Sequence, residues 1–186
     1  MAAHLELLRP GTTALFIIDL QEKLFPAIWD KERLLVNVTK LLHLANILKL
    51  KTLPTTQYRQ GLGATIPEVA SLLPEAPMDK TSFGCLGDER IVKRLEQEVP
   101  RTHTLLIAGI ETHICVMQTV LGALAAGYRV HVAADATSSR SASNVQLGLE
   151  RMREAGAVIS STEMAIYELL ARSDREEFKQ MLPYLK

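Results

Sequence analysis

Runs of consecutive apolar residues alternate along the chain with segments whose apolar residues recur every three or four positions. Strands are predicted over residues 13–19, 51–55, 104–109, 129–135 and 157–160, with a weaker one over 78–81, and the apolar character is strongest in 13–19 and 104–109. Continuous runs of this length, rich in β-branched residues, are typical of strands that are buried on both faces. Pro54 in the second run indicates a strand end or a sheet edge, because proline donates no ladder hydrogen bond.

Helices are predicted between these runs. Apolar residues spaced by three and four positions predict a first helix that follows Asp30, a candidate N-cap, and reaches Leu48. A loop with a short helix is predicted over 61–73, and further helices over 88–99, 115–126 and 142–154. Two helices close the chain, and Ser173 with Glu176 forms a candidate capping box for the last one.

The alternation of strands and helices predicts the fold class. Strands separated by helices pair in parallel through right-handed crossovers. We therefore expect an α/β protein with a doubly wound, Rossmann-like and mostly parallel sheet. Helices should cover both faces, giving three α/β/α layers. Because the chain contains no internal repeat, low-complexity tract or linker, residues 1–186 are expected to form one domain.

Composition limits the choice of partners. Lys and Arg number 21, as do Asp and Glu, so the net charge is zero. Such a chain has no excess of positive charge to attract nucleic acid or an anionic membrane. Its low net charge also favours self-association, because the copies repel one another little. No apolar run is long enough to span a membrane, and the N-terminus lacks the apolar core of a signal peptide. We expect a cytoplasmic homo-oligomer that acts on a small molecule.

Polar residues that follow the predicted strands are candidates for the functional site, because ligands bind at the carboxyl ends of parallel strands. Asp19, Lys80 and Cys115 follow three different strands and should lie on one rim. Other side chains expected there are those of Gln21, Gln57, Tyr58, Phe83 and Asp135.

Cys115 is the candidate nucleophile. It starts a predicted helix directly after a buried strand, where helix amides would stabilise a thiolate and an oxyanion. The alternative is a small cysteine packed in the core, which is how we interpret Cys85 in the glycine-flanked segment 84–87.

Asp19 and Lys80 are candidate partners of this cysteine. Asp19 is either a general base that takes the thiol proton or a cap of the next turn. Lys80 is either a surface residue or a partner of Asp19 that favours the thiolate and polarises a substrate carbonyl.

Metal, cofactor and phosphate sites are not indicated. None of the histidines His4, His43, His103, His113 and His131 has a second ligand at metal-binding spacing on one loop. The pair Gly61 and Gly63 lacks the third glycine and the context of a dinucleotide-binding loop. A dyad of His113 with Cys115 is conceivable, although side chains two residues apart on a tight turn rarely meet. We predict neither a metal nor a cofactor.

Together these segments resemble the isochorismatase-like cysteine hydrolase family, and most closely its isochorismatase domain-containing branch. The resemblance lies in residues 16–21, in Lys80 with Thr81, in the Gly-Ile-Glu-Thr-His-Ile-Cys segment 109–115 and in 135–141. The branch is similar in 56–63, 138–141 and 151–156. The metal-binding nicotinamidases of the family carry an Asp and His cluster after the second strand. Residues 55–59 contain no histidine, which argues against a zinc-dependent nicotinamidase.

The resemblance implies a six-stranded sheet and a catalytic triad of Asp19, Lys80 and Cys115. It also implies a cis peptide at Ile110–Glu111 that aims the Glu111 amide, with the Cys115 amide, at one oxyanion. The activity it implies is metal-independent hydrolysis of a small amide through a thioacyl enzyme. Gln21, Gln57, Tyr58 and Phe83 would line the pocket. The alternatives are a vinyl ether hydrolase, a non-catalytic binding protein and a redox sensor that uses Cys115.

Overall fold

A parallel sheet forms the centre of the protein. The computed structural model describes residues 6–100 and 103–185, so the candidate His4 lies outside the described residues. The strand order is β3-β2-β1-β4-β5-β6, and every pair is parallel. The strands are β1 (Thr13–Ile18), β2 (Lys51–Gln57), β3 (Met78–Lys80), β4 (Thr104–Ile110), β5 (Arg129–Ser138) and β6 (Val158–Ser160).

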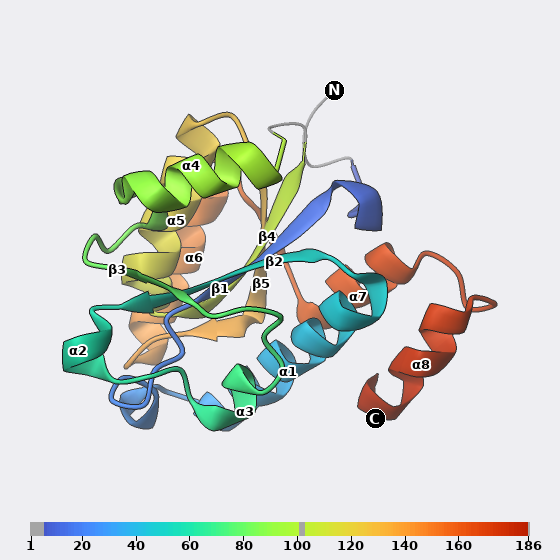
Figure 1. The fold of residues 1–186 in the computed structure, drawn as a ribbon, viewed down its shortest axis with the longest axis horizontal. Helices are drawn as coiled ribbons and strands as arrows, with labels where there is room; N and C mark the ends of the chain where they lie inside the picture. The colour runs from blue at the N-terminus through green and yellow to red at the C-terminus, as the bar shows by residue number, and fades with distance from the viewer. Residues whose placement is uncertain (1–5, 101–102, 186) are drawn as a thin grey trace.

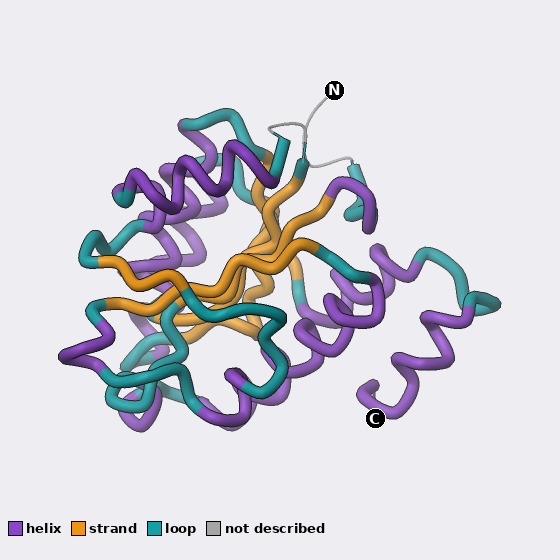
Figure 2. Tube along the Cα trace, viewed as in Figure 1, coloured by secondary structure: helices purple, strands orange, loops and turns teal. Residues whose placement is uncertain are grey.

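Helices cover both faces of this sheet (Figure 1). One face packs against α4 (Glu89–Glu98), α5 (Met117–Ala125) and α6 (Ala142–Glu154). The other packs against α1 (Lys31–Leu48) and α7 (Thr162–Leu170), and α8 (Glu176–Leu185) lies against α1. The predicted three-layer, doubly wound fold is confirmed, with the strands between layers of helices (Figure 2). An apolar core lies on each side of the sheet.

Short helical turns lie in the connections between the main elements. Two α-helical turns follow β2, namely α2 (Arg59–Leu62) and α3 (Pro67–Ala70). The 3₁₀ turns are η2 (Pro10–Thr12), η3 (Phe25–Ala27) and η4 (Cys85–Gly87), and a π-helical turn, η5 (Thr112–Val116), precedes α5. No helix among residues 6–100 and 103–185 is long and apolar enough to cross a membrane.

Two strands extend beyond their apolar runs. β2 continues to Gln57, and its pairing with β3 starts only at Thr55, so Pro54 has a neighbouring strand on one side only. β5 continues to Ser138 with an irregular register opposite β4. Asp135 therefore lies inside β5, where its carboxylate accepts hydrogen bonds from the amide and hydroxyl of Thr162 at 2.7 and 2.9 Å. The prediction that Asp135 lies on the functional rim is wrong, because it binds the start of α7.

Both predicted side-chain caps are also wrong. Asp30 does precede α1, but it adopts a left-handed conformation and binds the guanidinium of Arg33 instead of a helix amide. The last helix begins at Glu176, so Ser173 does not occupy its N-cap position. The boundaries of these helices follow the apolar pattern, whereas their caps depend on local side-chain pairs.

Gly109 fixes the contact between the two central strands. Its φ is +122°, and a Cβ atom would collide with the backbone oxygen and nitrogen of Ile18 in β1. We expect Gly109→Ala to lower the free energy of unfolding by about 3 kcal/mol or more, because strain and overpacking add. Gly127→Ala is the matched control, with a φ of +87° and no atom within 4 Å of the new methyl group. It should cost only about 1 kcal/mol. Urea denaturation measures both, and equal losses would contradict the tight β1–β4 contact.

Candidate active site

The candidate site lies where the order of the sheet reverses. From β1 the chain proceeds through β2 and β3 on one side, and from β4 through β5 and β6 on the other. In doubly wound sheets a crevice opens at the carboxyl ends of the strands at this point. Asp19 follows β1, Lys80 ends β3, and Cys115 lies in η5 just after β4. The structure thus brings the three predicted catalytic residues to one place, which we call the Asp19–Lys80–Cys115 cluster.

Asp19 and Lys80 form a fully buried ion pair. The Lys80 Nζ atom lies 2.7 Å from Asp19 Oδ2, and neither side chain is exposed. The other carboxylate oxygen, Oδ1, accepts a hydrogen bond from the hydroxyl of Thr55 at 2.8 Å. A buried carboxylate is costly unless it is paired, and here both oxygens have donors. Asp19 is therefore held in one orientation, with a donor on each oxygen.

Lys80 has more acceptors than Asp19 alone. Its Nζ atom also donates to Gln57 Oε1 at 2.8 Å and to the carbonyl oxygens of Ser82 and Phe83 at 3.3 and 3.1 Å. Burial lowers the pKa of Lys80, but the charge of Asp19 and other nearby groups outweighs burial and raises it. Lys80 thus stays charged, and its N–H donors all have acceptors within the protein. This geometry does not favour the expectation that Lys80 polarises a substrate carbonyl, because its donors are already used.

The thiol of Cys115 lies beside the Asp19–Lys80 pair. Cys115 is 7% exposed, and its thiol is close enough for the charges of Asp19 and Lys80 to shift its pKa. Burial, and next the negative charge of Asp19, raise the pKa of Cys115 to about 12, although the charge of Lys80 lowers it. These two effects outweigh the position at the start of a helix, which by itself would stabilise a thiolate. At rest the cysteine is a neutral thiol beside a base.

Hydrogen bonds within the chain fix the turn that carries Cys115. The carbonyl oxygen of Glu111 accepts the amides of Ile114 and Val116 at 3.0 and 3.2 Å. The hydroxyl of Thr119 donates to the carbonyl of Cys115 at 2.6 Å and accepts the amide of Cys85 at 2.9 Å. The peptide bond between Ile110 and Glu111 is cis. The thiol is thus presented by a turn that is tied to its neighbours on both sides.

The predicted pocket residues divide into two pairs. Gln21 is fully buried, and its amide bonds the backbone of Gln57 and Gly63. Gln57 is 8% exposed and bonds Lys80. In contrast, Tyr58 is 49% exposed and Phe83 is 56% exposed. Tyr58 directly follows Gln57, and Phe83 comes shortly after Lys80 in the sequence. The two aromatic residues are thus the exposed members of the set, whereas the amides of the two glutamines are hydrogen-bonded within the protein.

Three further residues lie around the cluster, and one of them, Thr55, was not predicted. Thr55, which holds Asp19, lies two positions before Gln57 on β2, and residues at this spacing share one face of a strand. That spacing could have identified it. His113 hydrogen-bonds to the hydroxyl of Ser139 at 3.0 Å, and no pairing with Cys115 is observed. Cys85 is fully buried, as expected for a packed cysteine, with its sulfur 3.9 Å from the Thr55 hydroxyl.

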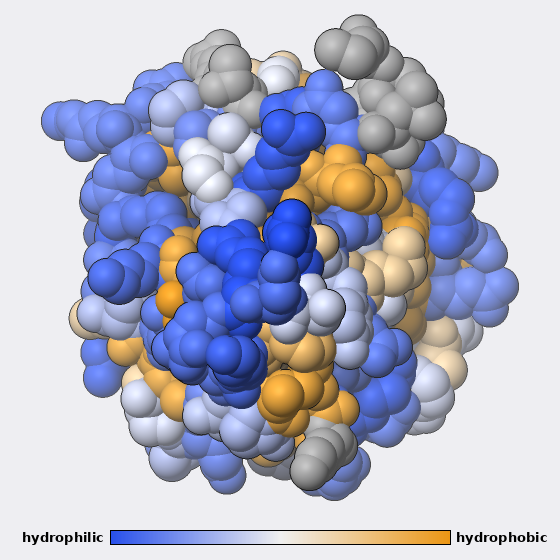
Figure 3. Space-filling model, turned by 90° about the vertical axis from the view of Figure 1, so that its right-hand side faces the viewer, coloured by the Kyte–Doolittle hydropathy of each residue, from blue (hydrophilic) through white to orange (hydrophobic). Residues whose placement is uncertain are grey.

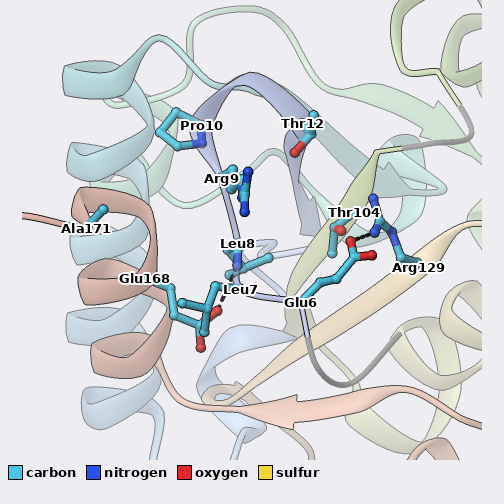
Figure 4. A pocket seen from close by; sticks show the side chains of 10 residues that line it. All are labelled: Glu6, Leu7, Leu8, Arg9, Pro10, Thr12, Thr104, Arg129, Glu168 and Ala171. Atoms are coloured by element: carbon cyan, nitrogen blue, oxygen red, sulfur yellow. Dashed lines mark hydrogen bonds and ion pairs between the residues drawn. The ribbon is translucent and has the colours of Figure 1, made fainter. Parts of the chain in front are cut away.

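In the part of the chain that the structure describes, neither a metal centre nor a second cavity involves the cluster. Among the described residues, no group of three or more His, Cys, Asp or Glu side chains could hold a metal ion. A cavity of about 900 Å³ lies at the opposite, amino-terminal end of the sheet, where Thr12, Thr104 and Arg129 line it beside an ion pair of Arg129 with Glu6 (Figure 4). It contains no member of the Asp19–Lys80–Cys115 cluster.

Comparison with known proteins gives a consistent assignment. A sequence profile described as the isochorismatase domain matches residues 13–164. The chain is 36% identical to the secreted isochorismatase effector Isc1 of Phytophthora sojae, over 95% of this chain and 86% of that protein. It is 33% identical to isochorismatase domain-containing protein 2 of Bos taurus, over 95% and 84% of the two chains.

Solved structures share the fold. The MAR1 ribonuclease structure from Caenorhabditis elegans superposes with a TM-score of 0.88 at 34% identity, covering 97% of this chain and 92% of that one. YcaC from Pseudomonas aeruginosa, described with hexane-2,5-diol and covalent acrylamide, gives 0.88 at 26% identity, covering 96% and 91%. YcaC from Escherichia coli, described as an octameric hydrolase of unknown specificity, gives 0.87 at 26% identity, covering 96% and 93%.

Proposed function

Because this chain belongs to the isochorismatase family, we propose that it is a cysteine hydrolase that cleaves the carbon–nitrogen bond of a small amide-type substrate without a metal. The observation that carries the proposal is the buried ion pair of Asp19 with Lys80, at 2.7 Å, beside the buried thiol of Cys115. A nucleophile beside a base, and a third group that orients the base, is the arrangement that nucleophilic catalysis requires.

The mechanism starts from a neutral thiol. Since the pKa of Cys115 is about 12, the thiol proton passes to Asp19 as the sulfur attacks the substrate carbonyl carbon. The amides of Glu111 and Cys115 hold the oxyanion of the tetrahedral intermediate. Asp19 then returns the proton to the leaving nitrogen, which departs as an amine or ammonia and leaves a thioester. Water attacks the thioester, Asp19 accepts a proton from this water, and the acid leaves as the thiol is restored.

The acrylamide bound covalently to YcaC from P. aeruginosa supports an electrophile-reactive site in a relative. Acrylamide combines an amide with a carbon that thiols attack. We expect acrylamide to modify Cys115 once and to leave Cys85 unmodified in the folded protein, because Cys85 has no exposed surface. Intact-protein mass spectrometry with peptide mapping measures this. Cys115→Ser should take up no label, and modification at Cys85 alone would contradict the proposal.

The alternatives place different demands on the cluster. A vinyl ether hydrolase needs an acid that protonates the substrate but no nucleophile. A binding protein needs neither, and a redox sensor needs a cysteine but no adjacent carboxylate. The buried Asp19–Lys80 pair has a clear use only where a proton moves during the reaction, which favours hydrolysis over binding and redox sensing. Dependence of turnover on the sulfur of Cys115 separates amide hydrolysis from vinyl ether hydrolysis.

The name of the C. elegans relative raises nucleic acid as another substrate. A zero net charge provides no attraction for phosphates, and the thiol is 7% exposed. A small molecule thus fits better than a polynucleotide, and the absence of an RNA partner stays a prediction. Location in the cytoplasm also stays a prediction, and the P. sojae relative is described as secreted.

We further propose that the chain forms a homo-oligomer. Its E. coli relative is described as an octamer. Large apolar side chains are exposed on the C-terminal helices, among them Met164, Tyr167 and Leu182. Figure 3 views the molecule from the side of α8 and shows apolar patches between the polar groups. Light scattering should give a mass above that of one chain, and a monomer at all concentrations would contradict this.

A further inference from the structure

The acceptors around Lys80 include one neutral side chain. Asp19 provides a carboxylate and residues 82 and 83 provide backbone carbonyls, whereas Gln57 provides the amide oxygen Oε1 at 2.8 Å. The other half of the same amide, Nε2, donates to the carbonyl of Thr81 at 2.9 Å. Gln57 therefore binds the ammonium and also the chain segment that follows it.

The amide of Gln57 can adopt only one orientation here. If it were flipped, Nε2 would face the Lys80 ammonium, which has only donors, and Oε1 would face the Thr81 carbonyl, which has only acceptors. The strand beneath is fixed as well. Gln21 Oε1 accepts the amide of Gln57 at 2.7 Å, and Gln21 Nε2 donates to the Gln57 carbonyl at 3.1 Å. Oε1 of Gln57 is thus an acceptor whose orientation is fixed by the side-chain hydrogen bonds, and the backbone of Gln57 is fixed by Gln21.

We propose that Gln57 is a positioning residue that holds the Lys80 ammonium in place between Asp19 and residues 81–83, and does not contact substrate. With Oε1 of Gln57 and the two carbonyls on its other donors, Nζ cannot turn away from Asp19. The exposed Phe83 is held by the same cation through its carbonyl oxygen. Because Gln57 is neutral, it fixes the cation without competing with Asp19 for its charge. This inference rests on the proposed function and assigns Gln57 a role in the same site.

Labelling of Cys115 reports on the inference without a known substrate. The thiol is influenced by Asp19 after β1, Lys80 at the end of β3 and Cys85 in η4. In the wild-type protein the rate of alkylation by iodoacetamide should rise about tenfold per pH unit between about pH 7 and 10. The reason is that the pKa of about 12 lies above this window and only the thiolate reacts.

Two substitutions at Gln57 should change this profile. Gln57→Glu places a second carboxylate beside Lys80, which raises the pKa of Cys115 further and lowers the labelling rate about tenfold at each pH. Gln57→Met removes the acceptor without changing charge. The ammonium then shifts from its position and lowers the pKa of Cys115 less effectively, so the rate should fall by about threefold or more.

Gln21→Met is the matched control. It removes hydrogen bonds to the backbone of Gln57 and Gly63 but none from Lys80, so it should lower the melting temperature and change the labelling profile clearly less than Gln57→Met does. Circular dichroism verifies that each variant is folded. A profile of folded Gln57→Glu that superposes on the wild type would overturn the inference, as would equal effects of Gln21→Met and Gln57→Met. The proposed function would fail separately, if wild-type protein labelled at Cys115 as described but no amide were hydrolysed.

Discussion

Replacement of Cys115 by alanine is expected to lower hydrolysis of any amide substrate by about 10⁴-fold or more, since members of a nucleophile–base unit act together. Cys115 provides the atom that bonds to the acyl group, and no other thiol can replace it, because Cys85 is fully buried. Turnover of a panel of small amides, followed by release of ammonia or amine, measures this.

The control for this variant is Cys85→Ala. It removes the second sulfur and leaves a small buried space, so it should cost about 1–2 kcal/mol of stability and keep turnover within a few-fold of wild type. If Cys115→Ala kept a substantial part of the turnover, Cys115 would not be the nucleophile. Equal losses from both substitutions would point to a structural effect.

Replacement of Lys80 by methionine should have the largest effect on stability. The side chains of Lys80 and Asp19 are both fully buried. Removing the cation leaves an unpaired carboxylate in the interior and breaks bonds to Gln57, Ser82 and Phe83. Breaking a buried ion pair in this way costs about 3–5 kcal/mol. Urea denaturation at neutral pH gives the loss, and turnover should also disappear because Asp19 is no longer held.

The double variant Asp19→Asn with Lys80→Met separates charge from packing. Because it removes both charges, it should recover most of the stability that Lys80→Met loses. It should recover no turnover, since the base is absent. If the double variant were as unstable as Lys80→Met alone, the loss would come from packing, and the account of the ion pair would be wrong.

The arrangement of the sheet could be predicted because the patterns that determine it lie within short, continuous segments of the sequence. The central strands β1 and β4 are nearly continuous apolar runs, and the alternation with helices sets parallel pairing. Because ligands bind at the carboxyl ends of parallel strands, Asp19, Lys80 and Cys115 could then be predicted to lie on one rim. The ends of β2 and β5 could not be predicted in this way. Thr55 and Gln57 are polar but buried, because their partners Asp19 and Lys80 come from other strands.

The electrostatics of the site also depend on contacts that the sequence does not reveal. The position of Cys115 near a helix start suggests an ionised thiol, whereas burial and the nearby charge of Asp19 give a neutral one. The same holds for the two glutamines. Gln21 and Gln57 are residue types that often line pockets, and here their side-chain amides are hydrogen-bonded to other groups of the protein. Side-chain roles within a buried cluster follow from its pairings and not from position along the chain.

Covalent trapping of the acyl group tests the central claim most directly. Wild-type protein incubated with a panel of small amides is quenched in acid, and the intact mass and the Cys115 peptide are measured. The account predicts, for amides that are turned over, a thioester on Cys115 whose added mass equals the acyl part of the substrate. It also predicts that Cys115→Ser forms no such thioester. Rapid amide turnover with no adduct on Cys115 at any quench time, and persisting in Cys115→Ala, would contradict it.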